Sequence, residues 1–166
     1  IQKTVKAILL GSEDTQQKVK VTVEYRIDGS NAIFFTEKIY DVTLVSAPLS
    51  LAVSNINEVT SGQEVEFDVE ITSNSNTIIK GALLSVEYPF GFEFISSTPG
   101  PAFTDSVWDL GDIQPEGSRK IRLRGVIVGE NEEERVFRFS SGIKNERDEK
   151  EIGVAFKIVS KLSQIF

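Results

Sequence analysis

A strict two-residue alternation of apolar and charged residues is the clearest pattern in the chain. Positions 64–72 read EVEFDVEIT, in which Val65, Phe67, Val69 and Ile71 are separated by acids. Successive side chains of a β-strand point to opposite faces, so one face of this segment is apolar and the other is charged. The pattern predicts a strand of an antiparallel sheet that faces a core on one side and water on the other.

Similar segments recur along the chain. Strands are predicted at residues 18–26, 82–88, 120–128 and 152–159, and turns rich in Gly, Asn, Asp and Pro separate them. No helical periodicity extends beyond a turn or two. About ten short strands with turns every 8–12 residues predict an all-β chain with an antiparallel β-sandwich of the immunoglobulin-like (Ig-like) type.

Two segments of the chain resemble each other. Lys6–Glu13 (KAILLGSE) is similar to Arg124–Asn131 (RGVIVGEN), and each is followed by a polar turn and an alternating strand. Gly11 and Gly129, which end the matching apolar runs, are 118 positions apart. This is about the length of one Ig-like domain, so the match indicates an internal repeat.

The repeat predicts the domain organisation. Residues 1–46 are expected to be the C-terminal part of one Ig-like β-sandwich domain, and residues 48–160 a complete second domain. Residues 161–166 are expected to be a linker or tail. Ala47-Pro48 marks the boundary, because proline cannot donate a hydrogen bond to a strand ladder. Residues 1–46 supply too few strands to close a sandwich, so we expect another protein or a second copy of the chain to cover them.

Charges on two predicted strands have opposite signs. The earlier strand carries Glu64, Glu66, Asp68 and Glu70, and the later one carries Lys120, Arg122 and Arg124. In Ig-like sandwiches the second and fifth strands are antiparallel neighbours in one sheet. We therefore predict a ladder of opposite charges on the outer face of the second domain, which fixes the register of the two strands.

Composition narrows the class of partner. The 166-residue chain is 40% hydrophobic and 26% charged, as in folded globular proteins. Its net charge of −7 argues against nucleic-acid or anionic-membrane partners. The longest wholly apolar runs are only a few residues, so no membrane contact is predicted within this part. The chain has no methionine and opens at Ile1, so we expect a processed piece of a longer protein.

The sequence offers no catalytic constellation. It has no Cys and no His, which removes thiolate chemistry, the commonest general base and the commonest transition-metal ligand. Asp105, Asp109 and Asp112 have a spacing that suits a cation, but aspartates in such positions more often form turns. We predict no catalytic residue, no cofactor and no metal site, and a chain that is not an enzyme.

Aromatic residues provide the alternative hypothesis. Tyr88, Phe90 and Phe92 are spaced two apart, and Trp108 follows. Exposed rings in this region would form a platform for sugar rings, which would make the chain a carbohydrate-binding module. The competing interpretation places most of the rings in the core, with Trp108 near Phe67 or Val69, because aromatic side chains are the largest apolar groups available.

Several short motifs carry a resemblance to a known family. They are Ser61-Gly62 before an alternating strand, then YPFGFEF at 88–94, WDLGDI at 108–113, Pro115-Glu116-Gly117, and the strand from Lys120. Residues 49–159 resemble the tandem Ig-like domains of bacterial and archaeal surface proteins, including the bacterial cell-adhesion-related group. The resemblance implies an extracellular, non-catalytic stalk or adhesion-type module of a bacterial cell-surface protein. It also implies neighbouring domains as partners and an anchor elsewhere in the protein.

Overall fold

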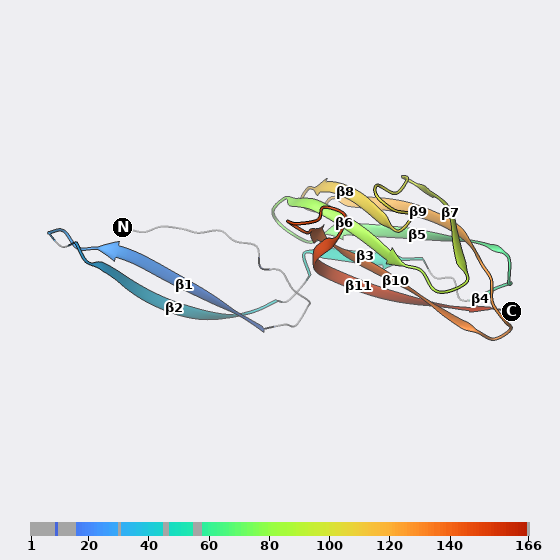
Figure 1. The fold of residues 1–166 in the computed structure, drawn as a ribbon, viewed down its shortest axis with the longest axis horizontal. Helices are drawn as coiled ribbons and strands as arrows, with labels where there is room; N and C mark the ends of the chain where they lie inside the picture. The colour runs from blue at the N-terminus through green and yellow to red at the C-terminus, as the bar shows by residue number, and fades with distance from the viewer. Residues whose placement is uncertain (1–8, 10–15, 30, 45–46, 55–57, 166) are drawn as a thin grey trace. The chain divides into compact units, whose positions relative to one another are not determined.

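We describe the protein from a computed structural model, which covers residue 9 and residues 16–29, 31–44, 47–54 and 58–165. The chain divides into two compact units, Ile1–Ser46 and Ala47–Phe166 (Figure 1). Every regular element in the described ranges is a β-strand, so the prediction of an all-β chain is confirmed. The described part contains no helix with the length and hydrophobicity of a membrane span. The earlier copy of the repeat, apart from Leu9, lies outside the described residues.

Unit 1 contributes a two-stranded antiparallel hairpin. Strand β1 (Gln16–Arg26) pairs with β2 (Ile33–Thr43) in one continuous register, with Gln16 opposite Thr43 and Arg26 opposite Ile33. Both strands follow from alternating residues rich in Val, Ile, Tyr and Phe. The turn between them includes Gly29, whose φ of 84° is readily adopted only without a β-carbon.

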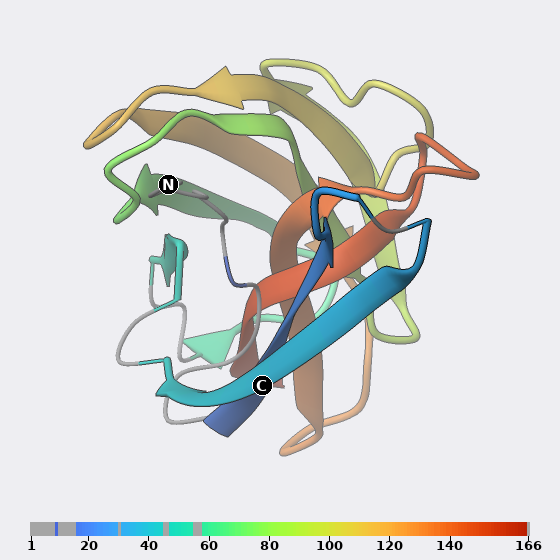
Figure 2. The ribbon, with the colours of Figure 1, turned by 90° about the vertical axis from the view of Figure 1, so that its left-hand side faces the viewer.

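Unit 2 is a sandwich of two sheets, which Figures 1 and 2 show stacked face to face. One sheet has the order β3 (Leu49–Val53), β5 (Glu64–Ser73), β9 (Ser118–Ile127) and β7 (Phe92–Thr98). The other has the order β4 (Glu58–Val59), β11 (Ile152–Ile165), β10 (Glu134–Lys144), β6 (Ile79–Glu87) and β8 (Val107–Ile113). The pairs are antiparallel except β4 with β11, which is parallel. The predicted Ig-like antiparallel β-sandwich is therefore confirmed.

The core lies between the two sheets. All four apolar residues of β5 that alternate with the acids are buried, and Phe67 and Ile71 are fully so. The Phe67 ring packs on Phe137 and Phe139 of β10, with centroids 4.6 and 5.8 Å apart. Each such side chain stabilises the fold by about 1.5–3 kcal/mol. The alternation seen in the sequence thus becomes the division between the core and the outer face.

The last strand corrects the predicted end of the domain. Residues 161–166 were expected to be a linker or tail, but β11 continues to Ile165. Ile165 is completely buried, and its backbone N–H donates to Glu133 O at 2.9 Å while its carbonyl accepts from Glu132 N at 2.7 Å. Burial of one more apolar side chain and these backbone bonds keep the end of the strand in the sandwich.

Candidate functional site

The outer face of β5 and β9 carries a ladder of opposite charges. The register places Glu66 opposite Arg124, Asp68 opposite Arg122, and Glu70 opposite Lys120. Acids alone along β5 would repel one another, and cations on the neighbouring strand offset that cost. The sign matching that the sequence predicts is present in this register.

Some ion pairs join directly opposite residues of the two strands, and others join diagonal neighbours. Arg122 Nε lies 2.9 Å from Asp68 Oδ1 and 3.3 Å from Glu66 Oε1, and Lys120 Nζ lies 3.5 Å from Glu70 Oε1. The hydrogen bond to Asp68, with the charges of Asp68 and Glu66, raises the pKa of Arg122. Arg124 reaches diagonally to Glu64 at 3.3 Å. Because all these side chains are well exposed, the ladder fixes register more than it adds stability.

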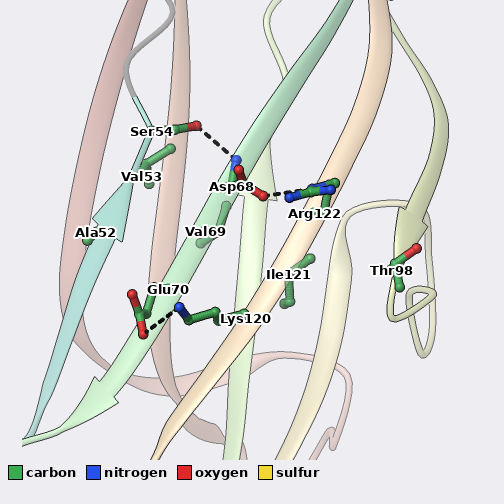
Figure 3. A pocket seen from close by; sticks show the side chains of 10 residues that line it. All are labelled: Ala52, Val53, Ser54, Asp68, Val69, Glu70, Thr98, Lys120, Ile121 and Arg122. Atoms are coloured by element: carbon green, nitrogen blue, oxygen red, sulfur yellow. Dashed lines mark hydrogen bonds and ion pairs between the residues drawn. The ribbon is translucent and has the colours of Figure 1, made fainter.

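A shallow hollow of about 650 Å³ lies over this ladder (Figure 3). Its charged walls are the pairs Asp68–Arg122 and Glu70–Lys120, and Ser54 Oγ accepts a hydrogen bond from Asp68 N at 2.8 Å. A charged ligand here would have to compete with these ion pairs. We therefore assign the charged side chains to the pairing of β5 with β9.

The structure does not bring the four aromatic candidates together as an exposed platform. Trp108 is only 1% exposed, which confirms its predicted burial in the core and removes it from the sugar-binding alternative. Tyr88 and Phe92 are half-buried and pack on each other with centroids 4.8 Å apart. Burial and the charge of Asp105 raise the pKa of the Tyr88 hydroxyl, which donates to the Asp105 carbonyl at 2.6 Å. Of the four rings, Phe90 alone is exposed, at 90%.

Trp108 instead closes one edge of the core. Its indole Nε1 donates to Ser97 Oγ at 3.0 Å and to Pro99 O at 3.2 Å. The ring packs edge-on against Phe94, with centroids 6.4 Å apart. The aromatic neighbour of Trp108 is thus Phe94 of β7, and the Phe67 ring packs on β10. The hydrogen bonds join β8 in one sheet to the end of β7 in the other.

A cluster that sequence reasoning missed joins three strands of the second sheet. Lys144 of β10 passes over Gly81 of β6 and places Nζ 2.9 Å from Asp109 Oδ2 of β8. Partial burial opposes ionisation of Asp109, but hydrogen bonds from Lys144 and from Gly111 N, with the charge of Lys144, lower its pKa overall. The hydrogen bond to Asp109 outweighs desolvation and raises the pKa of Lys144. Both groups are thus held in their charged forms.

Two of the three aspartates considered for a cation, Asp109 and Asp112, accept hydrogen bonds from backbone N–H groups, and Asp109 also forms an ion pair. Asp109 Oδ1 accepts from Gly111 N at 2.9 Å, and Asp112 Oδ1 accepts from Gly81 N at 3.0 Å. In the described ranges no group of three or more acids is placed to hold a metal ion. The arrangement of these carboxylates stabilises the bulged start of β6 opposite β8.

The edge of β8 is closed by a side chain from the other sheet. Arg119 of β9 donates from Nε to Leu110 O at 3.2 Å and from Nη2 to Asp112 O at 2.8 Å. The backbone N–H of Ala102 donates a hydrogen bond to a third carbonyl of β8, Val107 O, at 2.9 Å. Open strand edges are templates for pairing with other chains, so these contacts protect β8 from such pairing.

Comparisons with known proteins support the fold alone. No protein-family model and no curated protein sequence matches the chain. Among solved structures, it is similar to AvmM, which catalyses macrocyclization in alchivemycin A biosynthesis. That alignment has a TM-score of 0.53 and 12% sequence identity, and it covers 72% of this chain and 89% of that one.

Two further structures align more weakly. One is a chain of a type I cohesin–dockerin complex from Clostridium thermocellum, with a TM-score of 0.45, 14% identity, and coverage of 76% of this chain and 100% of that one. The other is PapD-like domain 7 of human CEP192, with a TM-score of 0.36, 10% identity, and coverage of 72% and 84%. TM-scores this low support no argument, and at 12% identity the likeness to AvmM concerns the fold alone.

Proposed function

We propose that this chain is a non-catalytic stalk or adhesion-type module of a bacterial cell-surface protein, built from Ig-like units in series. Its partners would then be the neighbouring domains of the same protein. The surface location comes from the resemblance of residues 49–159 to tandem surface domains. The serial arrangement has separate support in the structure.

The observation that carries the proposal is a match between two hairpins. Strand β1 begins at Gln16 and ends at Arg26, and β10 begins at Glu134 and ends at Lys144. Both ends are 118 positions apart, the same offset that separates the repeated sequence motifs. In each case an antiparallel partner strand follows directly. This agreement supports an arrangement of two units of the same kind in series.

The end of unit 2 is suited to a mechanical role. β11 runs parallel to β4, with Gln164 opposite Glu58 and Ile165 opposite Val59. This short ladder ties the last strand of unit 2 to a strand near its beginning. The backbone bonds between Ile165 and the turn at Glu132 and Glu133 add to this attachment.

The carbohydrate-binding alternative is supported only by the exposure of Phe90. A glycan array probed with the full chain separates the two functions, with Phe90→Ala as the variant. We expect no glycan to bind the unaltered chain. Binding that is lost in Phe90→Ala would overturn the structural proposal in favour of the alternative.

The surface location is tested by labelling cells of the source organism with an antibody raised against the chain. We expect intact cells to be labelled without permeabilisation, and an antibody against a cytoplasmic protein serves as the negative control. Labelling only after permeabilisation would contradict a cell-surface role.

A further inference from the structure

The β1–β2 hairpin exposes an apolar face that a stable domain would cover. Directly opposite residues of an antiparallel pair share a face, so Val21, Val23 and Tyr25 of β1 lie on the same side as Phe34 and Tyr40 of β2. These five side chains are between 37% and 48% exposed. A lone two-stranded hairpin is marginal in water, and an exposed apolar face of this kind marks a contact surface.

The matching hairpin of unit 2 shows what covers such a face. At the offset of 118 residues, Phe137 and Phe139 take the places of Val19 and Val21, and both phenylalanines are completely buried. Phe67 of β5 packs on both rings, and Phe92 packs edge-on against Phe137 with centroids 5.0 Å apart. The covering layer therefore consists of the strands that precede the hairpin in the chain.

In unit 2, the outer edge of the β10–β11 hairpin is also covered by a strand that precedes it in the chain. β6 pairs with β10 from Arg138 opposite Glu87 to Ile143 opposite Ala82. The equivalent segment of β1 is Lys20–Tyr25, and no described strand besides β2 pairs with it. Arg138 Nη1 lies 2.7 Å from Glu87 Oε2. Lys20, at the equivalent place, has the same charge sign as Arg138 and pairs within the hairpin with Glu37 at 2.6 Å.

We propose that β1–β2 is the closing hairpin of a second sandwich, covered by strands equivalent to β3–β8 that are joined to the N-terminal side of residues 1–10. The motif Lys6–Glu13 supports this source, because its counterpart Arg124–Asn131 spans the end of β9 and the turn into β10. In sequence, Lys6–Leu9 thus match the last four residues of β9, a strand of the covering layer in unit 2. The inference deepens the proposed function and rests on its serial arrangement.

The test supplies the covering strands from the chain itself. A copy of Ala47–Ser118 is fused directly in front of Ile1, because the 118-residue offset matches Ile1 to Arg119. The full 166-residue chain is retained behind the copy. Amide hydrogen exchange is measured over Lys20–Tyr25 in the extended and the original chain. We expect exchange to slow by at least about a hundredfold in the extended chain, since a closed sandwich opens far less often than an uncovered hairpin.

Two neighbouring substitutions provide a matched control in the extended chain. Val21 lies on the face to be covered, whereas Thr22 lies on the other face and donates to Glu37 at 3.5 Å. Val21→Lys is expected to abolish the added protection, and Thr22→Lys is expected to keep it. Equal behaviour of the two variants would contradict a covered face.

A second variant keeps the test decisive if the first fusion does not close. The double substitution Val19→Phe with Val21→Phe gives β1 the two phenylalanines that pack against the same covering strands in unit 2, where they are Phe137 and Phe139. If neither fusion protects Lys20–Tyr25, the proposal is overturned. It is also overturned if the original chain is already protected there, as a monomer or as a dimer seen by light scattering. These outcomes do not affect the labelling and glycan experiments, so the surface function stands or falls separately.

Discussion

Replacing Trp108 provides the most direct measure of what holds unit 2 together. The side chain is 1% exposed, packs on Phe94 and donates to Ser97 Oγ and Pro99 O. Trp108→Ala removes the ring and leaves a cavity, at a cost of about 3–5 kcal/mol. Trp108→Phe keeps one of the two fused rings and removes the N–H donor together with part of the packing, which leaves Ser97 Oγ and Pro99 O without this partner. We therefore expect an intermediate loss of stability for Trp108→Phe.

The assay is equilibrium urea unfolding followed by far-ultraviolet circular dichroism, because Trp108 is the only tryptophan and its fluorescence is lost in both variants. Phe90→Ala is the control: its ring is 90% exposed, so its loss should change stability by no more than about 0.5 kcal/mol. Domains of this size are stable by about 5–15 kcal/mol, so the alanine variant should unfold at a clearly lower urea concentration. A Trp108→Ala variant as stable as the control would refute the assignment of Trp108 to the core.

Three further substitutions test local features of unit 2. Gly91→Ala is expected to destabilise unit 2 much more than Gly62→Ala. Both residues have a positive φ, but of the two only Gly91 would bring the new methyl group against a backbone carbonyl oxygen. Urea unfolding of the two variants measures the difference. The pKa of Asp109 is lowered in the folded state, so its pair with Lys144 adds stability at neutral pH that is lost as the pH falls through the carboxyl pKa. Asp109→Asn should lower the melting temperature at pH 7 and leave it unchanged at pH 2, and an equal loss at both would contradict this. Arg119→Ala should increase self-association relative to the original chain, because it uncovers two carbonyl groups on the edge of β8. Light scattering measures the mass, and an unchanged mass at high concentration would show that the edge needs no such cover.

Two-residue alternation predicted the parts of the fold that depend on local sequence. In β5 each apolar residue is buried and the acids beside it face outward, because a strand has no other way to separate the two kinds of side chain. The same periodicity misleads where the backbone departs from a strand. Phe90 has the spacing of a face shared with Phe92, but it sits in a turn in which Gly91 has a φ of 82°, so its ring points to solvent.

Contacts between distant segments could not be predicted from the sequence. The pair Lys144–Asp109 requires β10, β6 and β8 to be neighbours, because its two residues come from β10 and β8 and the Lys144 side chain lies against Gly81 of β6. No local pattern specifies that order of strands. The same is true of Arg119, whose position in an alternating cationic strand does not show that it reaches the edge of the other sheet.

The sheet edges of the two units differ in a way that bears on the hairpin. In unit 2, β4 has two residues, β3 has five, β7 is interrupted by a bulge at Ile95, and β8 is capped by Arg119. Short, bulged or capped edges are how natural sheets avoid pairing with other chains. By contrast, β1 and β2 each extend for eleven residues without such an interruption. Among the described strands, β1 and β2 pair only with each other, whereas each sheet edge of unit 2 is short, bulged or capped. This difference is explained if β1 and β2 are interior strands in the assembled protein. The free hairpin is then an element of a larger sheet, and its neighbours are the strands that the repeat places before it.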